Sequence, residues 1–87
     1  PYPAEIQVSP AGENVTISWT GKDEDEDIMH YDILLSTENP PLSPLLENTQ
    51  LTSVTEVLSL GVTYYVQVIT TDNENNTSNS QIIRFTP

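Results

Sequence analysis

The stretch LSLGVTYYVQV, residues 58–68, joins a tight turn at Gly61 to a run in which Tyr64, Val66 and Val68 alternate with other residues. Side chains at every second position lie on the same face of a β-strand. One continuous apolar face is typical of a strand whose sheet packs against a second sheet. This stretch therefore predicts one strand of a β-sandwich.

The remainder of the chain repeats this pattern, with turn-forming residues about every 8 to 12 positions, and shows no helical period. Prolines at positions 40, 41 and 44 deny the segment 42–50 the hydrogen bonds of a central strand, so we expect an irregular or edge strand there. Besides the strand at Tyr64, the pattern predicts strands around Ile6 and Val8, Val15 to Trp19, Tyr31 to Leu35, Leu45 and Leu46, Val54 to Leu58, and Ile83 to Phe85.

The apolar residues of these strands, taken at every second position, supply a complete core for two facing sheets. We therefore predict one domain over residues 1–87, an all-β, seven-stranded antiparallel immunoglobulin-like β-sandwich. The residues predicted to face inward are Ile6, Val8, Val15, Ile17, Trp19, Tyr31, Ile33, Leu35, Leu58, Tyr64, Val66, Val68, Ile83 and Phe85.

Five of these residues resemble the pattern of a fibronectin type III domain: Trp19 on the second strand, Tyr31 opening the third, Leu58 with Tyr64 at a tyrosine corner, and Phe85 on the last strand. Leu60 stands where that family usually has proline. The combination is most similar to the type III modules of bacterial secreted and surface proteins. The resemblance implies fibronectin type III topology, a place within a larger multidomain protein, and an extracellular, cell-surface or periplasmic location.

Composition excludes several classes of function. The formal net charge is -11, from 13 acidic side chains against two basic ones, and this charge repels nucleic-acid phosphates and anionic lipid headgroups. The same charge opposes self-association, so we expect a monomer. No apolar run approaches the roughly 20 residues that span a bilayer, so no membrane insertion is expected. The chain has no cysteine, and the core must form without a disulfide.

The strongest candidate site is the run of five consecutive carboxylates at residues 23–27, between the second and third predicted strands. Asp23, Asp25 and Asp27 place hard oxygen ligands at alternate positions, and Ca²⁺ takes six to eight oxygens. Glu26 stands where comparable Asp-x-Asp-Gly-Asp loops have a glycine. Two interpretations stay open, a calcium site at Asp23, Asp25 and Asp27, or a solvated acidic loop that binds no cofactor.

Other candidate chemistry is weaker. His30 is the one histidine, and with no cysteine it lacks partners for a transition-metal site. Serines are plentiful, but the nucleophile elbow Gly-x-Ser-x-Gly is absent. Tyr64 is expected to place its ring in the core and its hydroxyl near Leu58, which is a structural role. We therefore expect no enzyme activity.

These features together predict a non-catalytic spacer or protein-interaction module of an extracellular or cell-surface protein. Its partners would be the neighbouring domains of the same polypeptide, and another protein or a glycan could join them. The alternative is a ligand-binding module, with Ca²⁺ at the acidic loop or carbohydrate on exposed aromatic rings such as Tyr2 and Tyr65.

Overall fold

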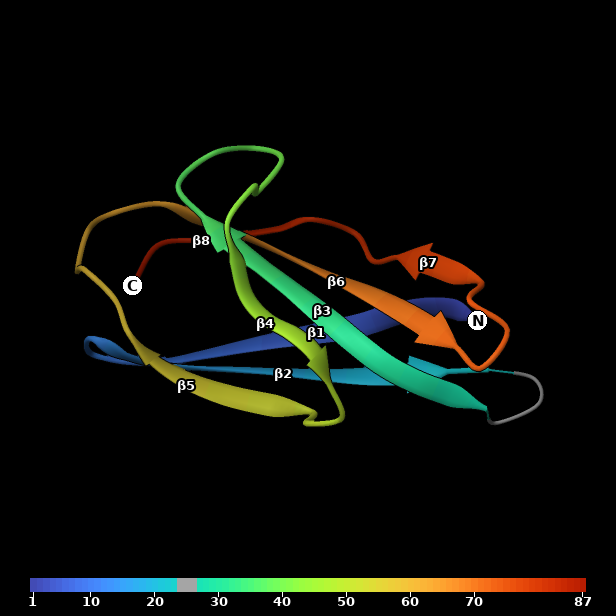
Figure 1. Ribbon diagram of the computed structural model, residues 1–87. Helices are drawn as coiled ribbons and strands as arrows, with labels where there is room; N and C mark the ends of the chain where they lie inside the picture. Colours follow the sequence, from blue (N-terminus) through green and yellow to red (C-terminus); the bar gives the residue numbers. More distant parts are fainter. Residues whose placement is uncertain (24–26) are drawn as a thin grey trace.

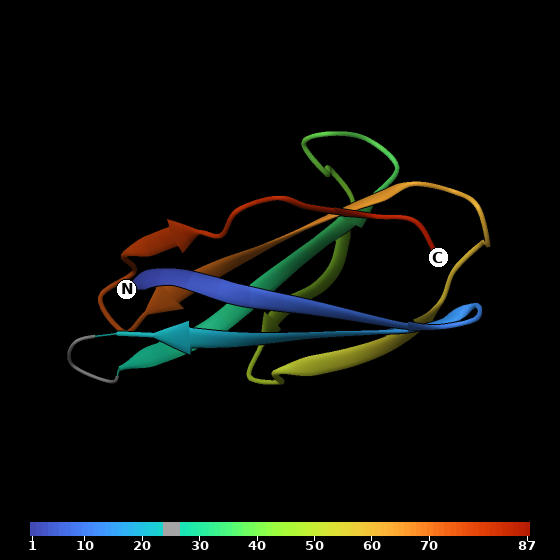
Figure 2. The same cartoon turned by 180° about the vertical axis from the view of Figure 1, so that it is seen from behind.

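The computed structural model describes residues 1–23 and 27–87, and of residue 29 it describes the backbone alone. These residues form eight β-strands and no helix, so none of them belongs to a helix that could cross a membrane. The strands make two antiparallel sheets that face each other (Figure 1; Figure 2). The expected all-β antiparallel sandwich is confirmed at this level.

One sheet has three strands in the order β1 (Tyr2–Ala11), β2 (Asn14–Lys22) and β5 (Ser53–Val57). The other has five strands. Its main path runs β4 (Pro44–Thr49), β3 (Ile28–Ser36), β6 (Tyr64–Asp72) and β7 (Thr77–Asn79), and β8 (Ile83–Phe85) also pairs with β6. As the prolines indicated, β4 is an edge strand, and its register with β3 is irregular.

The prediction of seven strands is wrong among the described residues, because the last predicted strand is preceded by a separate one. Both β7 and β8 pair with β6, but at different places along it. Ser80 lies between them and is buried. Its side-chain oxygen accepts a hydrogen bond from Val68 N–H at 2.9 Å, while its own N–H donates to the Val68 carbonyl at 2.8 Å. A side chain thus replaces one backbone rung and interrupts the ladder.

The core follows the predicted alternation. Val15, Ile17 and Trp19 of β2 are buried and face the second sheet, and they form one cluster with buried residues of β3 and β6. Trp19 contacts Tyr31 edge to face, with ring centroids 6.2 Å apart. The buried apolar residues are Ala4, Val15, Ile17, Trp19, Tyr31, Ile33, Val66 and Val68, and those partly buried against them are Ile6, Val8, Ile28, Leu35, Leu45, Leu46, Val54, Leu58, Ile83 and Phe85.

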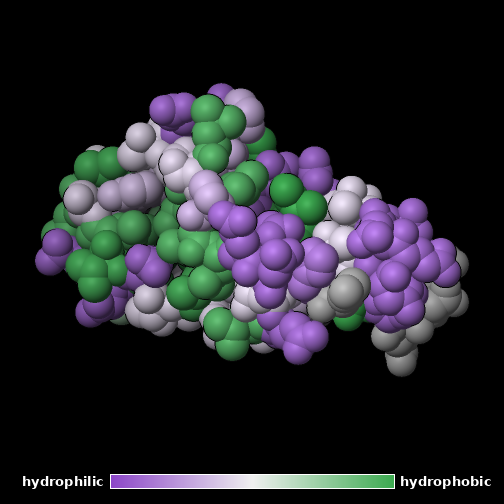
Figure 3. Space-filling view, in the orientation of Figure 1, coloured by the Kyte–Doolittle hydropathy of each residue, from purple (hydrophilic) through white to green (hydrophobic). Residues whose placement is uncertain are grey.

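The two ends of the sandwich differ. The molecule measures 40 × 21 × 17 Å, and its termini lie at opposite ends (Figure 1). We call the end near the N-terminus, where β2 and β6 stop and β3 begins, the acidic end. We call the other, where β5 stops and β6 begins, the C-terminal end. Hydrophilic side chains gather at the acidic end, whereas hydrophobic ones are frequent at the C-terminal end (Figure 3).

Candidate functional site

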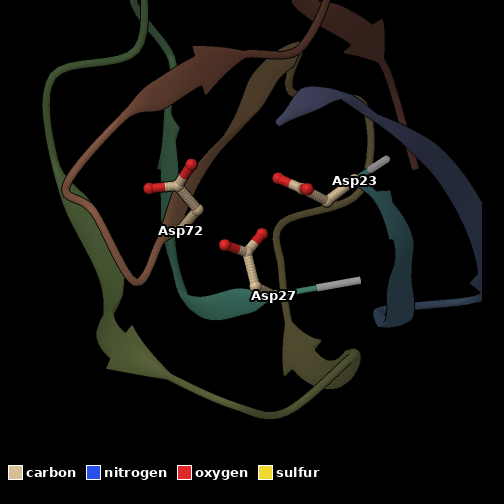
Figure 4. Close-up of side chains that lie close together, drawn as sticks. All are labelled: Asp23, Asp27 and Asp72. Atoms are coloured by element: carbon tan, nitrogen blue, oxygen red, sulfur yellow. The ribbon is translucent and has the colours of Figure 1, made fainter. Parts of the chain in front are cut away.

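The acidic end brings together three carboxylates from segments that are far apart in the sequence. Asp23 follows the last residue of β2, Asp27 precedes the first residue of β3, and Asp72 is the last residue of β6. Each offers a ligand oxygen, and these oxygens lie within 4.8 Å of one another. In Figure 4 the carboxylates of Asp23 and Asp27 point into the space between the three residues, whereas the carboxylate of Asp72 is turned toward its own turn.

The structure brings together two of the three residues of the expected site and adds a third. Asp23 and Asp27 lie together as predicted, whereas Asp25 lies outside the described residues. Asp72 was missed, although a signal for it existed. The inward row that begins at Tyr64 reaches Asp72 at every second position, and β6 pairs directly with β3, where Ile28 lies opposite Asp72.

The turn after β6 fixes Asp72. Its Oδ1 accepts hydrogen bonds from the backbone N–H groups of Glu74 and Asn76, each at 2.9 Å, and its Oδ2 accepts one from the Asn76 side-chain amide at 3.2 Å. Asn75, with φ of 64°, takes the left-handed conformation that asparagine tolerates. The sequence DNENN thus forms a turn that holds one carboxylate in place. Asn73 N–H donates to the Asp27 carbonyl at 3.2 Å, which ties this turn to the start of β3.

Asp72 is buried, and Asp23 and Asp27 are half-buried as whole residues. The Asp23 side chain is 7% exposed, and Asp72 is 5% exposed. The Oδ1 atom of Asp27 is buried and receives no hydrogen bond from the residues that the structure describes. The pocket between them has a volume of about 280 Å³, and it is also lined by Pro1, Tyr2, Glu74 and Asn76.

The pKa values of Asp27 and Asp72 are shifted in opposite directions. A hydrogen bond with Asp23 raises the pKa of the Asp27 carboxyl above its ordinary 3.8, and burial and the charges of Asp23 and Asp72 add to the increase. Burial would also raise the pKa of Asp72, but the hydrogen bonds from Asn76 and Glu74 outweigh burial and hold that pKa below 3.8. Of these two carboxyls, Asp27 is therefore the one on which a negative charge is less favourable.

One positive group lies beside the cluster. The N-terminal ammonium of Pro1 is 3.3 Å from Asp23 Oδ2. The Lys22 ammonium, although next to Asp23 in sequence, pairs instead with Glu5 at 3.6 Å on the exposed surface. Among the described groups, the three clustered carboxylates and Glu74, which lines the same pocket, thus have one ammonium beside them.

The other sequence candidates lie elsewhere. His30 is on β3 with its Nε2 4.0 Å from Asp32 Oδ2, outside the acidic cluster. Tyr64 has the expected structural role, because its hydroxyl accepts a hydrogen bond from Ser59 N–H at 3.0 Å and its ring stacks on Phe85. Of the two aromatic rings considered for carbohydrate, Tyr2 is 46% exposed and Tyr65 is half-buried.

No protein family model and no curated protein sequence matches the chain. Solved structures do match. Pectate lyase Pel3 from Pectobacterium carotovorum aligns in two crystal structures with TM-scores of 0.77 and 0.79 at 15% and 16% identity. A β-1,2-glucanase from Parabacteroides distasonis aligns with a TM-score of 0.68 at 23% identity.

Each match covers 98% of this chain, but only 27% of the pectate lyase chains and 12% of the glucanase chain. At these identities the likeness shows the fold alone. The expected membership of the fibronectin type III family is wrong, because no family model matches and the solved structures described above are chains of a pectate lyase and a glucanase. The tyrosine corner and the tryptophan that suggested it are requirements of sandwich packing that unrelated families share. The chain shares the fold of one part of these pectate lyase and glucanase chains.

Proposed function

We propose that this domain is a non-catalytic spacer or protein-interaction module of an extracellular, cell-surface or periplasmic protein that acts on carbohydrate. The observation that carries the proposal is the coverage of the structural matches. The whole of this fold corresponds to about a quarter of one polysaccharide-degrading enzyme and to a still smaller share of another. A fold that forms a minor part of two enzymes with different reactions is best explained as an accessory unit.

The shape supports the role of a spacer. The long axis is 40 Å, and the termini lie at opposite ends of it (Figure 1). Hydrogen-bonded strands run along this axis and fill the interior with packed side chains. Such a unit holds whatever precedes and follows it at a fixed separation.

The described side chains argue against glycoside hydrolysis by this domain. A retaining glycosidase needs two carboxyl groups about 5–5.5 Å apart, and an inverting one needs about 6.5–9.5 Å. The three clustered carboxylates have oxygens within 4.8 Å of one another, which is shorter than either range. The ammonium of Lys22 is paired with Glu5 and not with this cluster.

The C-terminal end supports the interaction part of the proposal. Val57, the last residue of β5, is 71% exposed, and Leu60 and Val62, in the segment that joins β5 to β6, are 60% and 37% exposed. The Gly61 N–H donates to the carbonyl of Pro87 at 3.0 Å, so this segment lies beside the chain terminus. We expect contact with a neighbouring domain of the same polypeptide to bury these side chains.

Two measurements on the isolated domain test the proposal. Assays with polygalacturonate and with β-1,2-glucan should give neither unsaturated products nor new reducing ends. Activity that is lost on the substitution Asp27→Asn, and kept on Glu47→Gln at the exposed surface, would show a catalytic domain instead.

The second measurement addresses rigidity and association. Dyes attached at residues 1 and 87 should report one narrow distance distribution by single-molecule energy transfer, and sedimentation should give a monomer because the net charge opposes association. A broad distribution would remove the role of spacer. A tight dimer would contradict the expected monomer.

A further inference from the structure

We propose that the acidic end is a calcium site in which Asp23, Asp27 and Asp72 hold one ion between the two sheets. This inference is separate from the accessory role, because a spacer could carry the site or lack it. It replaces the loop-only site expected from Asp23, Asp25 and Asp27 with one built from three strand ends.

The first argument is distance. Calcium binds oxygens at 2.3–2.6 Å, so two oxygens on opposite sides of the ion are about 4.6–5.2 Å apart. The three carboxylates offer oxygens that all lie within 4.8 Å of one another, which fits inside that shell without movement of the backbone. Magnesium binds at about 2.0–2.1 Å and needs opposite oxygens only about 4.1 Å apart, so it requires a tighter cluster.

The second argument is independent of the number of acids and concerns one buried atom. Asp27 Oδ1 is buried and has no hydrogen-bond partner among the described residues. A carboxylate oxygen that loses water without gaining a partner is unfavourable. Asp27 points toward Asp23 and Asp72 (Figure 4), so a cation in their common space would supply the missing interaction. A merely solvated loop would instead turn this oxygen to water.

The third argument is charge. The Asp23 side chain and Asp72 are more than nine-tenths buried, and Glu74 lines the same pocket. Carboxylates this close repel one another strongly where water is excluded. The ammonium of Pro1 against Asp23 is the positive group described there, and it leaves an excess of negative charge.

The donor set selects the class of metal. The cluster consists of carboxylate oxygens, without histidine or cysteine among its three described members. Zinc and copper favour nitrogen and sulfur ligands, whereas calcium favours oxygen. Three carboxylates supply between three and six oxygens, and water can complete the six to eight that calcium takes. The pocket of about 280 Å³ has space for such waters.

The position of the ion gives it a mechanical role. Asp23 follows β2 of the three-stranded sheet. In the five-stranded sheet, Asp27 precedes β3 and Asp72 is the last residue of β6. An ion held by all three joins the two sheets at the end where the apolar core has given way to polar side chains. It would act as a cross-link in a chain that has no disulfide.

Thermal unfolding with and without calcium tests the site. In chelator-treated protein, a hundredfold excess of Ca²⁺ over its dissociation constant should raise Tm by about 10 °C or more, beyond the effect of NaCl at matched ionic strength. Calorimetric titration should give one saturable site. The variant Asp27→Asn should fold, because it removes a repelled charge, and should weaken calcium binding on the order of tenfold or more. The matched control Glu47→Gln makes the same charge change on the exposed surface and should bind calcium like the parent.

Three results would overturn the proposal: an increase in Tm no greater than that of matched NaCl, no saturable heat, or equal weakening by Asp27→Asn and Glu47→Gln. None of these depends on whether the domain is catalytic or a spacer. Failure here and failure of the proposed function are therefore distinguishable.

Discussion

The two ends of this sandwich are built from the same strands but are organised differently. At the C-terminal end, the hydroxyl of Tyr64 accepts a hydrogen bond from Ser59, five residues away. At the acidic end, Asp72 meets Asp23 and Asp27, which precede it by more than forty residues. One end is a local motif, and the other is assembled only when the two sheets pack. The middle of the sandwich, where the core is apolar, connects them.

The largest effect is expected in the middle. Trp19 is 3% exposed and contacts Tyr31, so Trp19→Ala should lower the free energy of unfolding by about 3–5 kcal/mol. Trp19→Phe is the matched control. The indole N–H has no hydrogen-bond partner among the described residues, so its loss should matter little and the change should stay below about 1.5 kcal/mol. Urea denaturation gives both values, and equal losses would mean that the ring is not packed as described.

A smaller effect is expected where the middle meets the acidic end. A Cβ added to Gly21 would lie 2.8 Å from Ile28 Cδ1 and from Tyr31 Cε1, and it would overlap the Tyr31 hydroxyl. Gly21→Ala should therefore lower the free energy of unfolding by about 1–3 kcal/mol. The same substitution in a Tyr31→Phe background should be less harmful, because the hydroxyl is gone. If denaturation shows the same loss in both backgrounds, the close packing of Gly21 against Tyr31 is incorrect.

At the C-terminal end, Tyr64→Phe removes one hydrogen bond and keeps the ring stacked on Phe85. We expect the free energy of unfolding to fall by about 1 kcal/mol. Amide exchange at Ser59 should quicken, while exchange at Val15 and Ile17 in the middle should change only in proportion to global stability. Unchanged exchange at Ser59 would contradict the local nature of this corner.

These contrasts explain which parts of the fold the sequence predicts. The strands, the inward rows and the tyrosine corner follow from patterns within a few residues, and they are confirmed. The additional strand β7 was not predicted, and its separation from β8 depends on Ser80, whose side chain accepts a hydrogen bond from Val68 on another strand. Nothing local marks that serine among the others. The acidic site was half predicted, since Asp23 and Asp27 are close in sequence, but Asp72 joins them through the pairing of β3 with β6.

The smallest effect is the pH dependence of the acidic end without metal. The raised pKa of Asp27 means that the folded state binds more protons than the unfolded state just above pH 3.8, so the contribution of this carboxyl to stability falls as pH rises through its folded pKa. Asp72, with a lowered pKa, contributes above 3.8 and loses that contribution as pH falls through its folded pKa.

The variant Asp27→Asn separates these opposed contributions. In chelator, urea denaturation at a series of pH values should show the variant gaining stability relative to the parent as pH rises above about 3.8. The control Glu47→Gln should not gain in the same way. If the parent has a higher free energy of unfolding than Asp27→Asn at neutral pH, the charge of Asp27 is already balanced by other residues of the protein.

The central claim is that the acidic end holds calcium between the two sheets, and crystals grown in calcium test it most directly. The account predicts one anomalous scattering peak about 2.3–2.6 Å from carboxylate oxygens of Asp23, Asp27 and Asp72 together. A map with no anomalous peak there, or with the only calcium held by residues of one sheet, would contradict it.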